Sequence, residues 1–337
     1  MSYATGDTGV HGQFKRPLPV VLYRQPGQLF QPVGPLVFRQ AARTCRKPLS
    51  RQDSHMAPRR LGQHFLEDSS VVDSIIAAAD LRSTDTVVEI GPGRGALTGE
   101  LVSRSGRVLL IEYDDDLADG LAAKYETNPG VRVLNADARD FGSDLDPWLT
   151  EGPYKVVGNL PYYAANPIVR NFLESTRKPT TMVIMVQREV ARDMAAQPGE
   201  MSLLSVAVQV YAEAEHVIDV PPECFNPPPK VHSTVLKLTP TPVPTVQFES
   251  AEDFFNLVRK GFKSPRKQLH NSLSDGLFIP LQDARSLVEL TGFETSRRPA
   301  TLSIADWQVL YDTWVKQGRP AQVPGSTRRK RNDRRDG

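Results

Sequence analysis

Short apolar runs alternate with stretches of helical spacing between residues 85 and 240. The apolar runs predict buried strands at 86–91, 107–111, 131–134, 154–158, 181–186, 215–220 and 233–238. Apolar residues at helical spacing lie between these runs, at 96–104, 116–125, 168–173, 190–196 and 203–211. Strands that alternate with helices predict a mostly parallel, seven-stranded sheet that is covered on both faces. With right-handed crossovers, this is a doubly wound, Rossmann-like α/β fold.

The pattern changes after residue 240. Residues 239–245 read Thr-Pro-Thr-Pro-Val-Pro-Thr, and alternating proline predicts a stiff, extended linker, which we place at 241–250. Beyond it the strand signals stop, and helical spacing lies at 251–262, 265–273, 281–290 and 304–316. The chain is therefore expected to hold a Rossmann-like domain at 56–240 and a small all-α domain at 251–317.

Both ends of the chain differ from this middle part. Residues 1–55 have recurrent prolines and no lasting period, and no apolar stretch of a signal peptide follows a basic start. We expect a disordered extension, a targeting peptide or an over-extended start there, because Met56 opens a stretch that looks like a natural beginning. Residues 318–337 contain the arginine-rich run 328–335 and are predicted to be a disordered basic tail.

Composition and charge narrow the class of protein. Of 337 residues, 39% are hydrophobic and 24% are charged, which excludes a fully disordered or fibrous chain. The two cysteines form no metal-ligand cluster, and no apolar stretch is long enough to span a bilayer. We therefore expect no metal, no membrane partner and a reducing, cytoplasmic location.

The net charge of +2 hides an asymmetry along the chain. Residues 1–55 and 316–337 each hold eight Lys or Arg and two acids, which leaves 25 basic and 35 acidic residues at 56–315, a net charge of −10. Nucleic acid bound by this part would therefore need a local basic patch. No acid lies at 254–274, and this stretch carries the candidate RNA-binding residues Arg259, Lys260, Lys263, Arg266 and Lys267.

Glycines and acids at predicted strand ends indicate a nucleoside ligand. Residues 89–95 read Glu-Ile-Gly-Pro-Gly-Arg-Gly, where Gly91 and Gly93 let the backbone approach a ligand closely. Glu112 ends the second strand 21 residues after Gly91, where an acid can bind ribose hydroxyls. Asp137 follows the third strand, where its carboxylate could accept an adenine amine. These features fit NAD as well as S-adenosylmethionine, but the spacing is not Gly-x-Gly-x-x-Gly, which disfavours NAD.

The tetrad Asn-Leu-Pro-Tyr at 159–162 is the most specific signal. The side-chain carbonyl of Asn159 and the backbone carbonyl of Leu160 offer two acceptors for the two hydrogens of an amine on an aromatic ring. Pro161 restricts the backbone and removes a competing donor. Tyr162 offers a flat face on which a base can stack.

These motifs together resemble the KsgA (RsmA) family of ribosomal RNA adenine dimethyltransferases, in order from about residue 59 to about residue 315. The resemblance rests on Gly-Gln-His-Phe-Leu at 62–66, Glu-Ile-Gly-Pro-Gly at 89–93, Glu112, Asp137-Ala138, the tetrad at 159–162 and Phe-Asn-Pro-Pro-Pro-Lys-Val at 225–231. It implies a class I methyltransferase fold with S-adenosylmethionine as methyl donor. The implied reaction is dimethylation of two adjacent adenosines in the 3′-terminal hairpin of small-subunit rRNA, in an assembling subunit, by a monomeric enzyme.

The resemblance also implies roles for single residues. His64, Leu66, Gly91, Gly93, Glu112, Asp137, Ala138 and Asn159 would contact the cofactor: Gly91 its methionine part, Glu112 its ribose and Asp137 its adenine amine. Asn159, Leu160, Pro161 and Tyr162 would hold the target adenosine, and Phe225 would stack on its base opposite Tyr162. The chain departs from the family pattern at His64, where Asn is frequent, at Tyr163, where Asn is common, at 165–167 and at 201–202.

Other functions remain open from the sequence. An Erm-type enzyme shares Asn-x-Pro-Tyr and acts on large-subunit rRNA, although the stretch 254–273 resembles the carboxyl-terminal domain of the KsgA family. A non-catalytic assembly factor with this fold is disfavoured by the intact Glu112 and 159–162. An NAD dehydrogenase is disfavoured because no acid/base histidine is evident in the second domain.

Overall fold

The computed structural model describes residues 64–141, 146–161 and 163–321. All of them fall in one compact unit. The predictions for residues 1–55, for Tyr162 and for the arginine-rich run 328–335 lie outside the described residues. The domain boundaries given above stay predictions.

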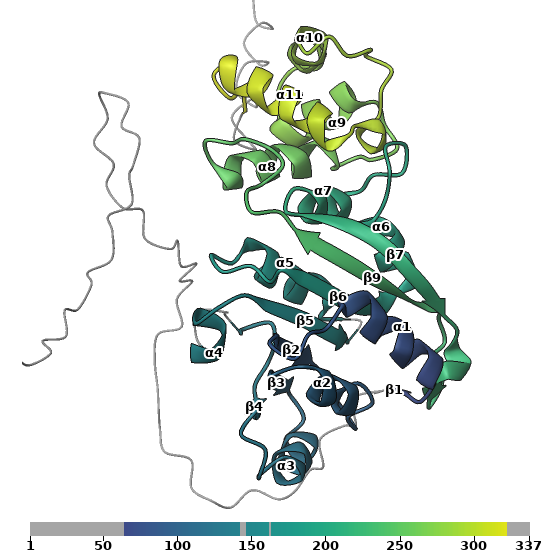
Figure 1. The fold of residues 1–337 in the computed structure, drawn as a ribbon. Helices are drawn as coiled ribbons and strands as arrows, with labels where there is room; N and C mark the ends of the chain where they lie inside the picture. Colours follow the sequence, from purple (N-terminus) through teal and green to yellow (C-terminus); the bar gives the residue numbers. More distant parts are fainter. Residues whose placement is uncertain (1–63, 142–145, 162, 322–337) are drawn as a thin grey trace, which may run out of the picture. The chain divides into compact units, whose positions relative to one another are not determined.

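A seven-stranded sheet forms the centre of the fold (Figure 1). Its order is β4 (Val131–Asn135), β3 (Arg107–Glu112), β2 (Thr86–Ile90), β5 (Tyr154–Asn159), β6 (Thr181–Gln187), β9 (Ser233–Pro240) and β7 (Ala212–Val220). The first five strands are parallel, and β9 pairs antiparallel with both β6 and β7. The predicted fold class, a mostly parallel sheet of the class I methyltransferase type, is confirmed.

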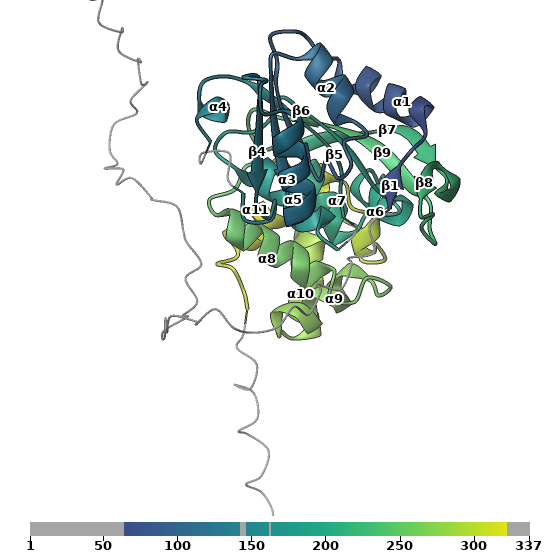
Figure 2. The ribbon, with the colours of Figure 1, turned by 90° about the horizontal axis from the view of Figure 1, so that it is seen from below.

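Apolar residues that alternate along the central strands build a core on each face of the sheet. Val87 and Leu110 join one buried cluster, whereas their neighbours Val88 and Leu109 join the other. The first face is covered by α1 (Ser69–Ala79), α2 (Thr98–Arg104) and α3 (Asp115–Lys124). The second is covered by α4 (Pro147–Thr150), α5 (Ala165–Glu174), α6 (Arg188–Met194) and α7 (Leu203–Gln209). Figure 2 shows the sheet between α1 and α2 on one side and α5, α6 and α7 on the other. Burial on both faces explains why the strands read as continuous apolar runs.

Helix α1 was not among the predicted helices. Its amino-terminal cap is Asp68, whose carboxylate accepts from the backbone N–H groups of Ser70 and Val71. Its buried residues Val71, Ile75, Ile76 and Ala79 follow helical spacing. This helical spacing is visible in the sequence, but it lies before residue 85, outside the alternating pattern from which the helices were predicted.

Four helices follow the sheet: α8 (Ala251–Gly261), α9 (Leu269–Leu277), α10 (Leu281–Leu290) and α11 (Ile304–Lys316). The predicted helix start at residue 265 was wrong. The backbone is extended at Gln268 (ψ 150°), and Leu269 N–H donates to Arg297 O from the segment before α11. The backbone N–H of Ser264 donates a hydrogen bond to the hydroxyl of Ser272. Tertiary contacts therefore keep 263–267 as a loop, despite its helical spacing.

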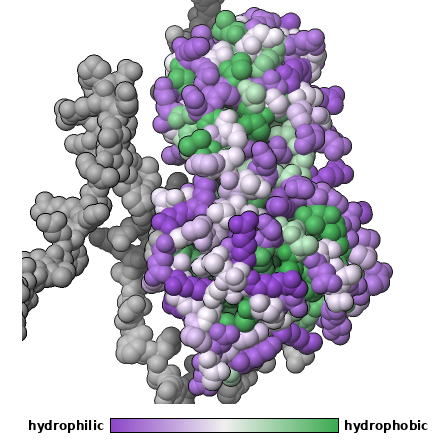
Figure 3. Space-filling model, in the orientation of Figure 1, coloured by the Kyte–Doolittle hydropathy of each residue, from purple (hydrophilic) through white to green (hydrophobic). Residues whose placement is uncertain are grey.

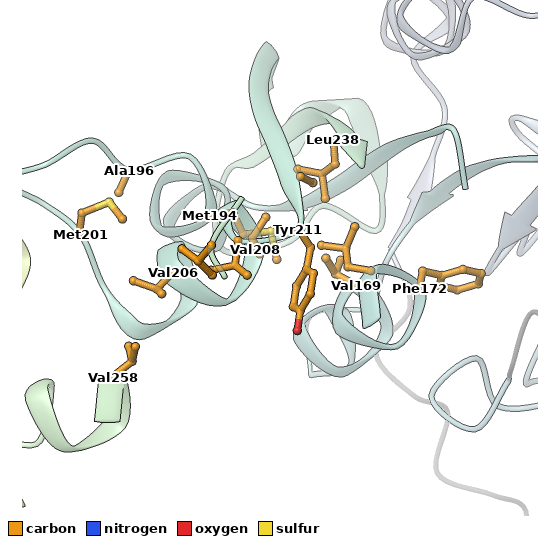
Figure 4. Packing of buried hydrophobic residues seen from close by; sticks show 14 of the residues in the cluster. Val169, Phe172, Met194, Ala196, Met201, Val206, Val208, Tyr211, Leu238 and Val258 are labelled. Carbon is orange, nitrogen blue, oxygen red and sulfur yellow. The ribbon is translucent and has the colours of Figure 1, made fainter. Parts of the chain in front are cut away.

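The proline-rich segment 241–250 packs against the α/β part and is not an extended linker between two separate domains. Thr241 N–H donates to Tyr211 O and Thr245 N–H donates to Val210 O, each at 2.8 Å, and Val246 is buried. One buried cluster continues from the sheet into the helical part, and Figure 4 shows a portion of it, from Phe172 of α5 to Val258 of α8. The helices after the sheet therefore share their core with it.

Two very short strands were not predicted either. β1 (Phe65–Leu66) pairs antiparallel with β8 (Phe225–Asn226), with Leu66 opposite Phe225. The 3₁₀ turns η2 (Pro222–Cys224) and η3 (Pro299–Thr301) complete the elements of the described part. The pairing of β1 with β8 joins two segments that both carry residues of the family motifs.

Polar residues dominate the face of the molecule that Figure 3 shows, and apolar residues are scattered among them. Of the described helices, none is long and apolar enough to cross a membrane.

We expect Gly158→Ala to lower the free energy of unfolding by about 1–3 kcal/mol, because the new methyl group overpacks the sheet. A Cβ on Gly158 would lie 2.6 Å from the carbonyl oxygen of Ile90 on the neighbouring strand β2. Gly120→Ala is the matched control: nothing lies within 4 Å of its Cβ in α3, so alanine should stabilise the protein by about 0.5–1 kcal/mol. Urea unfolding measures both changes, and equal stability of the two variants would contradict the overpacking.

Candidate active site

A cavity of about 300 Å³ lies at the carboxyl ends of β2, β3, β4 and β5. The sheet order changes direction between β2 and β5, which is where open α/β sheets bind ligands. Every described residue that was predicted to bind cofactor or target adenosine lines this cavity, namely His64, Leu66, Gly91, Gly93, Glu112, Asp137, Ala138, Asn159, Leu160, Pro161 and Phe225. Phe65, Glu89, Arg94, Tyr113, Asp114 and Tyr163 also line it and had no predicted role.

The turn after β2 requires glycine for two reasons. Gly91 and Gly93 have φ of +65° and +57°, in the left-handed region that side chains rarely adopt. A Cβ on Gly93 would also lie 3.2 Å from the ring of Phe65. The turn therefore presents bare backbone to the cavity, as a close-fitting ligand needs.

Backbone donors hold the carboxylate of Glu112, which is 5% exposed. Its Oε2 accepts from Gly93 N–H at 2.9 Å, and its Oε1 accepts from Tyr113 N–H and Asp114 N–H at 2.9 and 3.0 Å. A carboxylate has about four acceptor positions, so about one remains for a ligand. Glu112 thus fixes the glycine turn and faces the cavity at the same time.

Glu89 is a buried acid with no predicted role, although its motif was recognised. It is 1% exposed, and its Oε2 accepts from the hydroxyl of Thr98 at 2.7 Å. The pKa of Glu89 is raised to about 8, mainly because burial penalises the charged form; the Thr98 hydroxyl lowers the pKa and the nearby Glu112 raises it, and both effects are smaller than that of burial. A charged residue inside the apolar strand 86–90 is the sequence signal that could have found it.

Asp137 forms an ion pair with Arg139, which no sequence pattern indicated. The guanidinium of Arg139 lies 2.5 Å from Oδ2 of Asp137, and hydrogen bonds from the Arg139 side chain lower the pKa of Asp137. The carboxylate therefore stays charged at neutral pH.

The tetrad begins at the end of β5, beside the glycine turn. A Cβ on Gly91 would lie 3.5 Å from Asn159 O, so the two strand ends are in contact. Leu160 is buried and its N–H donates to Met185 O, and Ala164 N–H donates to Pro161 O in the turn that leads to α5. These bonds hold the backbone around the predicted amine acceptors.

The paired strands β1 and β8 close one side of the cavity. Phe225 is 4% exposed and packs with Leu66 in a buried cluster. The ring nitrogen Nδ1 of His64 lies 2.7 Å from Pro227 O, and the guanidinium of Arg94 lies 4.2 Å from the centre of the Phe65 ring. Residues 64–66 of the first motif therefore reach the cavity beside the second motif, with which Phe65 and Leu66 pair at Phe225–Asn226.

The charges around the cavity favour a cationic ligand. The carboxyl groups of Glu112, Asp114 and Asp137 line it, against one guanidinium, that of Arg94. Glu89 also lines it, but its pKa of about 8 leaves it largely neutral near pH 7. Such a surface attracts a sulfonium and an ammonium group and repels a pyrophosphate. The donor set thus fits S-adenosylmethionine better than NAD.

The predicted RNA-binding residues lie apart from the cavity lining, at the end of α8 and in the loop before α9. Lys267 pairs with the carboxylate of Asp275 at 2.9 Å, which offsets its charge. Lys263 donates to Asp275 O and lies 4.5 Å from the ring centre of Phe278, and Arg259 donates to the side chain of Asn256. We call Arg259, Lys260, Lys263, Arg266 and Lys267 the basic cluster.

Comparison with known proteins identifies the family. The model of the ribosomal RNA adenine dimethylase family matches residues 54–305. The chain belongs to this family. A ribosomal RNA small subunit methyltransferase A from Dehalococcoides mccartyi is 42% identical over 260 residues, 75% of this chain and 87% of the relative. The protein of the same name from Pelotomaculum thermopropionicum is 38% identical over 78% of this chain and 93% of its own length.

Solved structures agree with the family. A dimethyladenosine transferase from Plasmodium falciparum covers 76% of this chain and 98% of its own, with a TM-score of 0.64 and 26% identity. The 23S rRNA methyltransferase ErmE covers 74% and 98%, with a TM-score of 0.59 and 28% identity. The chain is therefore an rRNA adenine dimethyltransferase that uses a methyl donor of the S-adenosylmethionine type. Among the described residues, no group of three or more His, Cys, Asp or Glu could hold a metal ion.

We expect Glu89→Gln to flatten the pH dependence of stability. The pKa of Glu89 is about 8 in the folded protein, against an ordinary value of 4.5 for a glutamate in water, so between these pH values the folded protein holds a proton that the unfolded chain has lost. The contribution of protonated Glu89 to the free energy of unfolding is therefore fully present below about pH 4.5 and is lost as the pH rises through 8. Glutamine does not titrate. Urea unfolding at pH 5 and pH 9 should show a smaller loss in the variant, and an equal loss would exclude this origin.

Proposed function

We propose that this protein dimethylates the exocyclic amines of two adjacent adenosines in the 3′-terminal hairpin of small-subunit rRNA within an assembling subunit. The observation that carries the proposal is the placement of Asn159 and Leu160 beside the glycine turn, in one acidic cavity. The names of the relatives support the small subunit as the source of the rRNA. The likeness to ErmE keeps large-subunit rRNA as the second candidate substrate.

Residues of this chain would hold S-adenosylmethionine along the strand ends. The bare backbone at Gly91 would contact its methionine part, Glu112 its ribose and Asp137 its adenine amine. Gly93, Ala138, His64 and Leu66 would complete the walls. When bound, the cofactor supplies a methyl group already activated by its sulfonium, so the protein needs no covalent nucleophile.

The acceptor is the difficult partner in this reaction, because the lone pair of an adenine amine is delocalised into the ring. The side-chain carbonyl of Asn159 and the backbone carbonyl of Leu160 would each accept one amine hydrogen. These two bonds would draw the amine toward tetrahedral geometry and direct its lone pair toward the methyl group. Phe225 and Tyr162 would stack on the target base and offset part of the cost of unstacking it.

The basic cluster is the proposed contact with the rRNA backbone. The part of the chain at 56–315 carries a net charge of −10, so attraction to a polyanion must be local. Arg259 and Lys263 donate to an amide and a backbone carbonyl, which leaves their charges uncompensated by those bonds. Lys267 is paired with Asp275 and would contribute less.

A direct test compares the two purified ribosomal subunits, each lacking adenine dimethylation, as methyl acceptors. The proposal expects label in the small subunit and two adjacent dimethyladenosines by mass spectrometry. Label in the large subunit alone would establish the second candidate.

We expect Asn159→Ala to lower the single-turnover rate of methyl transfer by a factor on the order of 10²–10³, as for loss of a transition-state hydrogen bond, while cofactor affinity stays near that of the wild type. Asn135→Ala is the matched control, because Asn135 ends β4, outside the cavity lining, and bonds to Asp115. Near-normal transfer by Asn159→Ala would refute the amine-orienting role.

Glu112→Ala should have the opposite profile. It removes the acceptor of three backbone N–H groups and the predicted ribose contact, so cofactor affinity falls first. Calorimetric titration with S-adenosylhomocysteine measures this loss. An unchanged affinity would count against the contact.

Replacing Arg259, Lys263 and Arg266 together by alanine should weaken subunit binding and leave cofactor affinity unchanged. Each lost phosphate contact should flatten the log–log salt dependence by roughly 0.7–0.9. The control replaces Arg104, Arg170 and Arg285 by alanine. These residues form ion pairs on α2, α5 and α10, and their replacement removes the same amount of charge. The assignment fails if both triple variants show the same salt slope.

A further inference from the structure

Arg139 and Tyr163 lie beside the cavity and have no role in the reaction described so far. Arg139 follows Asp137 by two residues after β4, and Tyr163 lies in the turn before α5. Tyr163 lines the cavity and is 61% exposed. The guanidinium carbon of Arg139 lies 5.7 Å from the centre of the Tyr163 ring. The pair therefore links the loops that follow two strands separated in the sheet by β3 and β2.

Arg139 takes up most of the acceptor capacity of Asp137. Its backbone N–H donates to Oδ1 at 2.9 Å, its Nε lies 3.0 Å from both carboxylate oxygens, and its Nη2 lies 2.5 Å from Oδ2. Three N–H groups thus share the roughly four lone-pair positions of the carboxylate, and about one position remains. One hydrogen of an adenine amine needs one such position.

Relative strength decides whether a ligand displaces Arg139. Hydrogen bonds between a guanidinium and a carboxylate are charge-assisted and about twice as strong as neutral ones. An adenine amine is a neutral donor, so it cannot replace the guanidinium on Asp137. An adenine that docks there meets Arg139 in place, with the ring of Tyr163 beside it.

The local charge favours adenine over RNA as the ligand of Tyr163. Arg139 stands against Asp137 and Asp140, so this corner has no excess positive charge to attract a phosphate. Tyr163 is the most exposed aromatic side chain of the described part, and its ring gains contact area when a flat, neutral ligand covers it.

We propose that Arg139 and Tyr163 form a lid over the adenine end of the methyl-donor site. Arg139 is a positioning residue that fixes the carboxylate of Asp137, so that its remaining lone pair meets the adenine amine. Tyr163 stacks on the adenine ring. The inference rests on the proposed contact between Asp137 and adenine.

Calorimetric titration with S-adenosylhomocysteine tests the stacking. Tyr163→Ala should raise the Kd of this ligand about tenfold, as loss of one base–aromatic stack does. Tyr163→Phe keeps the ring and should stay within about twofold of the wild type. RNA affinity of the cofactor-free protein should be the same in all three proteins. Unchanged S-adenosylhomocysteine binding with weaker RNA binding in Tyr163→Ala would overturn the assignment in favour of an RNA contact.

A second ligand isolates the role of Arg139. S-inosylhomocysteine carries a carbonyl in place of the adenine amine, so the wild type should bind it more weakly than S-adenosylhomocysteine. Arg139→Met should lose most of this preference and bind S-adenosylhomocysteine more weakly, whereas Arg139→Lys should keep part of both. Tighter binding of S-adenosylhomocysteine by Arg139→Met would show that Arg139 competes with the adenine, and would overturn the lid.

These outcomes are separate from the proposed function. If the lid is wrong, the unaltered protein still methylates the small subunit. If the proposed function is wrong, the unaltered protein transfers no methyl group to that subunit, whatever the variants do to ligand binding.

Discussion

The close approach of β2 and β5 is the constraint on which the site depends. At Gly158 the neighbouring strand comes so near that a Cβ would lie 2.6 Å from the carbonyl oxygen of Ile90. One residue further along the chain from each of these positions, Gly91 and Asn159 are in contact at the carboxyl ends of the two strands. The backbone proposed to hold the methyl donor and the residue proposed to hold its acceptor therefore meet because both strands have glycine at this edge.

The acids around the cavity are each stabilised in a different way. Glu89 accepts one hydrogen bond, from the Thr98 hydroxyl, and is largely neutral at pH 7 because its pKa is about 8. The carboxylate of Glu112 accepts hydrogen bonds from three backbone N–H groups, and that of Asp137 forms an ion pair with the guanidinium of Arg139. Burial penalises charge on such groups, and a cationic ligand relieves that penalty. The same burial that costs stability thus selects a sulfonium ligand over an anionic one.

The basic cluster in the helical part supplies a local positive charge that the acidic α/β part lacks. It is attached through a continuous buried cluster and through the hydrogen bonds of Thr241 and Thr245, so the basic cluster has a defined position relative to the sheet. An RNA backbone held there would be presented to the cavity in a set orientation.

The sequence by itself determined the seven strands, most helices and the chemical groups at the strand ends, because period and motif are properties of neighbouring residues. It could not determine the pairing of β1 with β8, since two residues carry no period and the partners are far apart in the chain. The start of α9 at Leu269, the contact at Gly158 and the pKa of Glu89 depend on packing between distant segments. So does the reach of Arg139 from Asp137 to Tyr163. Tertiary structure alone decided these, because burial and the hydrogen-bond partners of a polar group arise only when separate segments meet.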